Sequence, residues 1–254
     1  MDRRPPPDVE RYARQVATVT RRALREQLVA AYLHGSAVLG GYTPSRSDVD
    51  VMLIVDGALP PSILQALAFS LGRDRLRSPG CGIELDVLTA DTAAHPIRPT
   101  PFQLVMASGV EGHQVTLGVD HGPYDDGVLH LAVTRAAGRP LFGPEPREVI
   151  GPVPRPLIVA QLDDELDWAA AHASAAYQAL GAARSWMYAE RNQLGSKIDA
   201  ARWARGRGHD DVLDAAVRFQ RGETDTGPEA DAVRALVAEA RQALARAARE
   251  PGSG

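Results

Sequence analysis

The feature that most constrains the fold of this 254-residue chain is a polar segment between two apolar stretches. The first stretch, residues 28–33, runs into a Gly-Ser pair, and the second, residues 51–55, directly follows Asp48-Val-Asp50. Because successive side chains of a strand point to opposite faces, Asp48 and Asp50 share one face. Two adjacent carboxylates repel each other, and they are tolerated where a divalent cation lies between them and a phosphate. The segment therefore predicts two strands joined by a turn, with a metal site at the start of the second strand.

The turn has the features of a phosphate-binding loop. Gly35-Ser36 enters what we expect to be a short helix, which offers free backbone N–H groups and a hydroxyl to phosphate oxygens. An Asp-x-Asp pair alone is a common solvated strand face. Here it is combined with Gly-Ser, a fixed spacer, Gly40-Gly41 and Ser47, and this combination is much rarer.

This combination resembles the signature of the nucleotidyltransferase superfamily. Within it, the stretch His34-Gly-Ser-Ala-Val-Leu-Gly-Gly is most similar to that of the aminoglycoside 3''-adenylyltransferases, the streptomycin and spectinomycin resistance enzymes. Those enzymes carry Tyr-Gly-Ser-Ala-Val-x-Gly-Gly and Ser-Asp-Ile-Asp at the corresponding positions. The alternative interpretation is a strand–turn–strand unit with polar ends and no catalytic role.

Composition excludes several classes of protein. A net charge of −4 and a pI near 6.0 argue against a general nucleic-acid surface and are compatible with a cationic small molecule. Cys81 is the only cysteine, so an internal disulfide is excluded and a reducing cytoplasm is expected. The first residues are not followed by an apolar segment, and no run of about 18 apolar residues occurs, so we expect neither a signal peptide nor a membrane span. We further expect a monomer.

Hydrophobic periodicity predicts an α/β half followed by a helical half. In the first half we expect a helix to about Gln27, strands near 28–34, 49–55 and 83–88, a helix from Pro60-Pro61, a Pro-rich connection over 90–101, a strand or helix over 102–118 and a helix over 128–136. A proline-spaced run from Pro144 to Pro156 marks the boundary, so the domains are taken as 1–150 and 151–254. Ala-rich helical patterns fill the second half, with breaks near Gly195, Gly206 and 224–228.

A third carboxylate for the metal site is expected from the strand over 83–88. Glu84 and Asp86 have the same side-chain parity, so both can face Asp48 and Asp50. The resistance enzymes have Leu-Glu-Val-Thr-Ile-Val here, and the resemblance implies that Glu84 is the general base and a metal neighbour. Asp86 falls where that pattern has a neutral residue. It is either a third ligand, a substrate contact or the polar face of a half-exposed strand.

The second half carries a further resemblance to the same family. Three stretches match family patterns in order. The family's Arg-x-Trp-Tyr is similar to Arg184-Ser-Trp-Met-Tyr, its Gly-Lys to Gly195-Ser-Lys197, and its Ala-Ala-x-Trp-Ala to Ala-Ala-Arg-Trp203-Ala. The resemblance implies that Arg184 and Lys197 contact the ATP phosphates, for which a guanidinium fork and a point charge are suited. Asp126 aligns with a family Asp near the nucleotide. The alternative for Arg184 and Lys197 is two ordinary surface cations.

The acceptor-binding stretch departs from the family. Residues 169–176 do not match the family's streptomycin-contacting loop, but an acidic run, residues 163–167, ends beside Trp168. Carboxylates next to an aromatic ring suit a guanidinium- or ammonium-bearing sugar. A charged helix start is the commoner meaning of such a run.

The resemblance implies a polymerase-beta-like nucleotidyltransferase domain of α/β class, followed by an all-α domain that clamps ATP and substrate. It implies ATP as co-substrate and two Mg²⁺ ions held by Asp48, Asp50 and Glu84, with further nucleotide contacts from Gly35, Ser36 and Ser47. The expected reaction is transfer of AMP to a hydroxyl of an aminoglycoside or aminocyclitol, with release of pyrophosphate. Two alternatives stay open: another small-molecule or protein hydroxyl as acceptor, and a nucleotide-binding regulator without turnover.

Overall fold

The computed structural model describes residues 4–109, 112–118 and 127–249. Contacts between Cα atoms divide the chain into two compact units, Met1–Val153 and Pro154–Gly254. Each unit is described by itself.

The first unit is built on a six-stranded mixed sheet in the order β5-β4-β3-β2-β1-β6. Strands β2 and β3 are parallel, and the other neighbouring pairs are antiparallel. The strands are β1 (Leu28–Leu33), β2 (Val49–Val55), β3 (Gly82–Thr89), β4 (Leu104–Gly109), β5 (Gly112–Leu117) and β6 (Arg139–Phe142).

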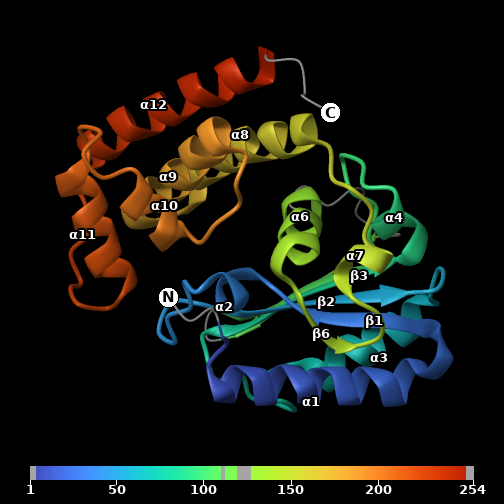
Figure 1. The fold of residues 1–254 in the computed structure, drawn as a ribbon. Coiled ribbons are helices and arrows are strands. Elements are labelled where there is room, and N and C mark those ends of the chain that lie inside the picture. Colours follow the sequence, from blue (N-terminus) through green and yellow to red (C-terminus); the bar gives the residue numbers. More distant parts are fainter. Residues whose placement is uncertain (1–3, 110–111, 119–126, 250–254) are drawn as a thin grey trace. The chain divides into compact units, whose positions relative to one another are not determined.

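Helices cover both faces of this sheet. Figure 1 shows α1 and α3 on one face, and α4, α6 and α7 on the other. Their bounds, together with those of the short helix α2, are α1 (Pro7–Leu24), α2 (Gly35–Leu39), α3 (Pro61–Leu71), α4 (Ala90–Ala94), α6 (Gly127–Ala137) and α7 (Pro146–Val149). A 3₁₀ turn, Arg25–Gln27, joins α1 to β1.

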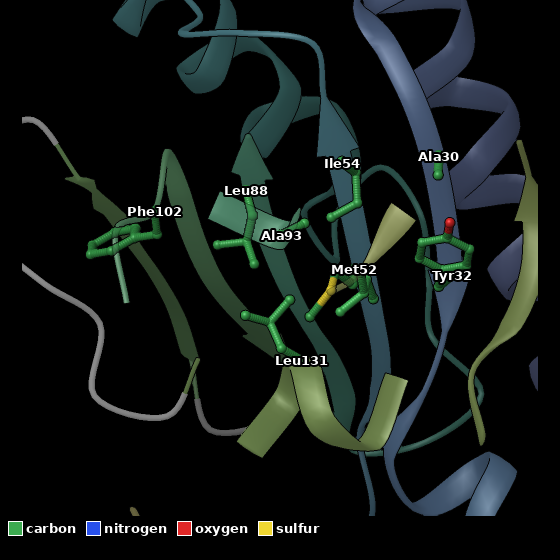
Figure 2. Packing of buried hydrophobic residues seen from close by; sticks show 9 residues of the cluster. Ala30, Tyr32, Met52, Ile54, Leu88, Ala93, Phe102 and Leu131 are labelled. Carbon is green, nitrogen blue, oxygen red and sulfur yellow. The ribbon is translucent and has the colours of Figure 1, made fainter. Parts of the chain in front are cut away.

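The apolar core between the sheet and α6 shows which face of the sheet carries the polar side chains of interest. Met52 and Ile54 on β2, Leu88 on β3 and Leu131 on α6 are fully buried in one apolar cluster (Figure 2). Asp50 has the parity of Met52 on β2, and Glu84 and Asp86 have the parity of Leu88 on β3. One face of the sheet therefore carries the apolar core at one end and the carboxylates at the other.

One local expectation for this unit needs correction, and two further segments are defined by the structure. The connection over 90–101 contains α4, and the Thr89 hydroxyl caps this helix by accepting a hydrogen bond from Thr92 N–H at 3.2 Å. For the segment over 102–118, where strand and helix were both left open, the structure shows strand: β4 and β5 pair antiparallel there. The edge strand β6 was not predicted, because it is only four residues long and contains Pro140, which cannot donate to a strand ladder.

The regular structure described in the second unit is helical. Its helices are α8 (Arg155–His172), α9 (Ala175–Arg191), α10 (Lys197–Trp203), α11 (Asp210–Gln220) and α12 (Ala230–Arg249). Helix α9 is the central one, and its buried face is largely alanine and glycine, so neighbouring helices approach it closely. The interruption between α8 and α9 at residues 173–174 was not predicted. Ser174 begins the new helix as the N-cap of α9, where its hydroxyl accepts a hydrogen bond from Tyr177 N–H. No helix in the described residues is both long and apolar enough to cross a membrane.

Candidate functional site

The parallel pairing of β2 and β3 brings the predicted carboxylates together. Asp50 lies directly opposite Glu84 in the register of the two strands. Asp48 is exposed at the start of β2, whereas Asp50 and Glu84 are half-buried. Burial, and then the charge of Glu84, raises the pKa of Asp50 well above its ordinary value. The site is therefore electrostatically unfavourable for its own carboxylates, as expected where a cation completes it.

The backbone of Gly35 lies directly against the carboxylate of Asp50. It has φ of +64°, and a Cβ built on it would lie 2.0 Å from Asp50 Oδ2. The backbone N–H of His34 also donates a hydrogen bond to the Asp50 carbonyl oxygen, at 3.0 Å. Ser36 follows in the first turn of α2, half-buried. The Gly-Ser pair thus adjoins the Asp-x-Asp pair.

The loop before β2 is ordered by Ser47. Its hydroxyl accepts a hydrogen bond from Thr43 N–H at 3.0 Å, and its carbonyl accepts one from Cys81 N–H at 3.0 Å. The loop is thereby fixed to the chain just before β3, where a Cβ on Gly82 would lie 2.9 Å from Asp48 Oδ1. The position of Ser47 is that of a loop-shaping residue, and its contact with a nucleotide stays a prediction.

Two histidines and Asp86 form a buried group on the same face. His130 Nδ1 lies 2.7 Å from Asp86 Oδ2, and His34 Nε2 lies 3.9 Å from that same oxygen. Burial first, and then the charge of His130, lowers the pKa of His34 to about 3, against the opposing influence of Asp86. His34 is therefore neutral at physiological pH.

This arrangement corrects one sequence interpretation and adds one residue that was not expected. Asp86 is only 1% exposed, so it is not the polar face of a half-exposed strand. No role was expected for His130, yet it hydrogen-bonds the carboxylate of Asp86. The shared parity of Glu84 and Asp86 was a usable signal for Asp86. No comparable signal existed for His130, because its helix is far from the other residues in sequence.

The second unit brings Arg184 and Lys197 to one carboxylate. Arg184 Nη2 on α9 contacts Glu165 Oε1 at 2.6 Å and Oε2 at 2.5 Å on α8. Lys197, the first residue of α10, places Nζ 3.2 Å from the ring centroid of Tyr177, whose hydroxyl lies 3.3 Å from Glu165 Oε1. Burial raises the pKa of Glu165, but the charges of Arg184 and Lys197 outweigh it and the pKa is lowered. The two cations predicted for ATP therefore converge.

The acidic run before Trp168 is largely engaged within the second unit. Arg241 on α12 pairs with both Asp163 and Asp167, and Glu165 pairs with Arg184. Trp168 keeps 52% of its surface exposed and stacks on His172 at a centroid distance of 5.4 Å. The run thus links helices, although Asp164, Asp167 and the adjacent Trp168 are exposed. Asp126 lies outside the described residues.

The chain is similar to known aminoglycoside adenylyltransferases in sequence. The family model described as the aminoglycoside adenylyltransferase C-terminal domain matches residues 148–247. Proteins named aminoglycoside (3'') (9) adenylyltransferase from Klebsiella pneumoniae and Shigella flexneri are 27% identical over 207 residues, covering 76% of this chain and 77% of theirs. A protein of the same name from Escherichia coli is 27% identical over the same length.

A solved structure shares the fold. The spectinomycin adenyltransferase AAD(9) from Enterococcus faecialis, solved with ATP and spectinomycin, superposes with a TM-score of 0.73 at 15% identity. The match covers 92% of this chain and 98% of that one.

Proposed function

We propose that this chain, a nucleotidyltransferase that resembles the aminoglycoside adenylyltransferases, transfers AMP from ATP to a hydroxyl of an aminoglycoside or aminocyclitol and releases pyrophosphate. The observation that carries this proposal is the register that sets Asp50 opposite Glu84, with Gly35 of the Gly-Ser turn packed against Asp50. Two carboxylates and a phosphate-binding turn at one point are what nucleotidyl transfer requires. The family match over 148–247 extends the resemblance to the second unit.

The donor set fits Mg²⁺. Asp48, Asp50 and Glu84 offer carboxylate oxygens, which this ion prefers, and the raised pKa of Asp50 reflects an excess of negative charge that a cation would balance. When bound, two Mg²⁺ ions would neutralise the triphosphate and lower the pKa of the acceptor hydroxyl. These three residues are the ones we assign to hold them.

Glu84 is our choice for the general base. It is half-buried on β3 and can accept a proton from an entering hydroxyl, whereas Asp86 is 1% exposed and already accepts a hydrogen bond from His130. The acceptor hydroxyl then attacks the α-phosphorus in line with the departing pyrophosphate.

The remaining assignments concern binding. Backbone N–H groups at Gly35 and Ser36 would bind phosphate oxygens, and Arg184 and Lys197 would bind the triphosphate as a fork and a point charge. Arg184 is held by Glu165 in this structure, so ATP would compete with that carboxylate for the guanidinium. The exposed ring of Trp168 is the surface that we assign to a cationic sugar.

A pyrophosphate-release assay tests the reaction. Purified protein is incubated with ATP, Mg²⁺ and a panel of streptomycin, spectinomycin and other aminoglycosides, with the Asp50→Asn variant as the matched control. Release that depends on one antibiotic and is absent in the variant is expected, and mass spectrometry should show an antibiotic heavier by one adenylyl group, that is, AMP less one water. Pyrophosphate release that does not depend on any antibiotic would indicate a different acceptor. Absence of pyrophosphate release with every acceptor would refute the proposal.

A further inference from the structure

Residues of three separate elements converge beside the proposed magnesium site. His34 follows β1, Asp86 lies on β3, and His130 lies on α6. One ligand atom from each lies within 4.8 Å of the other two. The rings of His34 and His130 are tilted by 57° with centroids 5.2 Å apart, so they do not stack face to face on each other. Two imidazoles and a carboxylate thus surround one point.

The group has unused hydrogen-bonding capacity. His34 is 1% exposed, and neither of its ring nitrogens has a hydrogen-bond partner among the described residues. In the same described part of the chain, Asp86 Oδ1 is also buried without a partner. Buried polar atoms are normally paired, so a histidine that is sealed from water and directed at a carboxylate has the capacity to bind a ligand. A neutral imidazole is the form that binds a metal ion.

We infer that His34, Asp86 and His130 form a binding site for one transition-metal ion of the Zn²⁺ class, distinct from the carboxylates assigned to Mg²⁺. Imidazole nitrogens favour Zn²⁺, Co²⁺ and Ni²⁺, whereas Mg²⁺ favours oxygen ligands. Three protein ligands leave a fourth tetrahedral position open, as in catalytic rather than structural zinc sites. The ion would take the place of the proton between His130 and Asp86 and would satisfy a nitrogen of His34.

A metal ion at this position would change the electrostatic environment of Asp50. The charges of both His130 and Asp86 act on Asp50, so the two sites share an electrostatic environment. A dication held by the histidines would reduce the negative charge around Asp50. The rival explanation is that the group is a buried hydrogen-bonded network with no ion, in which His130 merely holds Asp86.

Metal binding to the full-length protein distinguishes these explanations without ATP or acceptor, so the outcome is independent of the proposed AMP transfer. Chelator-treated protein is titrated with Zn²⁺ by calorimetry and with Co²⁺ by visible absorption. Wild type is expected to bind one ion of each, and Co²⁺ should give the intense d–d bands of a tetrahedral site.

The decisive variant is His130→Gln. Its amide can still donate a hydrogen bond to Asp86, and His130 is 18% exposed at its side chain, so folding should survive the change. Loss of a direct ligand should weaken Zn²⁺ binding by more than about 100-fold, the upper limit for losing an outer-shell partner. Asp86→Asn should behave in the same way. Circular dichroism and thermal melting verify the fold of each variant.

Two matched controls exclude other binding modes. His95→Gln removes an exposed histidine whose Nδ1 lies 3.1 Å from Asp91 Oδ1, a surface pair of the same chemistry, and it should leave the Zn²⁺ affinity unchanged. Asp48→Asn weakens the magnesium site and should also leave the Co²⁺ bands intact. Absence of Zn²⁺ binding in wild type, or undiminished binding in folded His130→Gln protein, would overturn the inference in favour of the hydrogen-bonded network.

Discussion

Replacing Gly35 by alanine tests how closely the backbone of the Gly-Ser turn defines the position of Asp50. The residue has φ of +64°, and the added Cβ would lie 2.0 Å from Asp50 Oδ2 and 2.3 Å from its Cγ. The backbone and the carboxylate cannot both stay in place, because side-chain Cβ atoms essentially never approach other heavy atoms within 3.0 Å.

The expected magnitudes follow from this geometry. Opening the contact from 2.0 Å to at least 3.0 Å displaces the Asp50 carboxylate by about 1 Å. A misplacement of that size lowers turnover by roughly 10²-fold. The left-handed backbone conformation costs about 1–2 kcal/mol for a residue with a Cβ. A loss of that size lowers the melting temperature by about 2–8 °C in a chain of this length.

Pyrophosphate release and thermal melting measure the two effects separately. Gly57→Ala is the matched control, because a Cβ there meets nothing within 4 Å, and it should leave both quantities nearly unchanged. A Gly35→Ala protein with wild-type turnover and an unchanged melting temperature would refute the reasoning. Loss of stability with full turnover would show that the carboxylate position is not critical.

Further predictions concern individual carboxylates and one cation. Asp50→Asn should abolish turnover but leave the free energy of unfolding equal or higher in urea melts, because burial and the charge of Glu84 already raise the pKa of Asp50. Glu84→Gln should lower kcat by about 10²–10⁴-fold, with little change in ATP affinity measured by calorimetry. An active Glu84→Gln variant together with an inactive Asp86→Asn variant would show that Asp86, and not Glu84, is the general base. Burial raises the pKa of Glu165, but the charges of Arg184 and Lys197 lower it by more, so the net shift is downward. The ionised carboxylate therefore stabilises the fold fully above a pH of about 4.5, and this contribution is lost as the pH falls through the lowered pKa. Urea melts between pH 3 and 6 should show this dependence in wild type and not in Glu165→Gln. Arg184→Ala should raise the KM for ATP by roughly 10–100-fold, the value of a charge-assisted hydrogen bond; an unchanged KM would withdraw its nucleotide role.

The sequence predicted the local parts of the site well. Alternation placed Asp48 with Asp50 and Glu84 with Asp86 on single strand faces, and strands β2 and β3 were expected within one residue of their observed ends. Side-chain parity depends only on neighbouring residues, so a single sequence contains it. The Gly35-Ser36 turn into a short helix, which was also expected, is equally local.

Contacts between distant segments were not accessible in the same way. His130 meets Asp86 across 44 residues, and Arg241 meets Asp163 across 78 residues, and in neither case does a motif join the two positions. The acidic run at 163–167 was considered for a cationic sugar, yet Asp163, Glu165 and Asp167 pair with arginines of neighbouring helices. Such pairings depend on how helices pack, which periodicity leaves undetermined.

The parallel pairing of β2 and β3 also bears on how the site comes into existence during folding. Parallel neighbours cannot be joined by a hairpin, so the chain between them, including α3, must cross over before Asp50 can meet Glu84. A slip of one residue in this pairing would place the two carboxylates on opposite faces of the sheet. The site is therefore absent from any intermediate that contains only local helices and hairpins. Recovery of ligand binding during refolding would report the closure of this long-range contact, which is a slow kind of step.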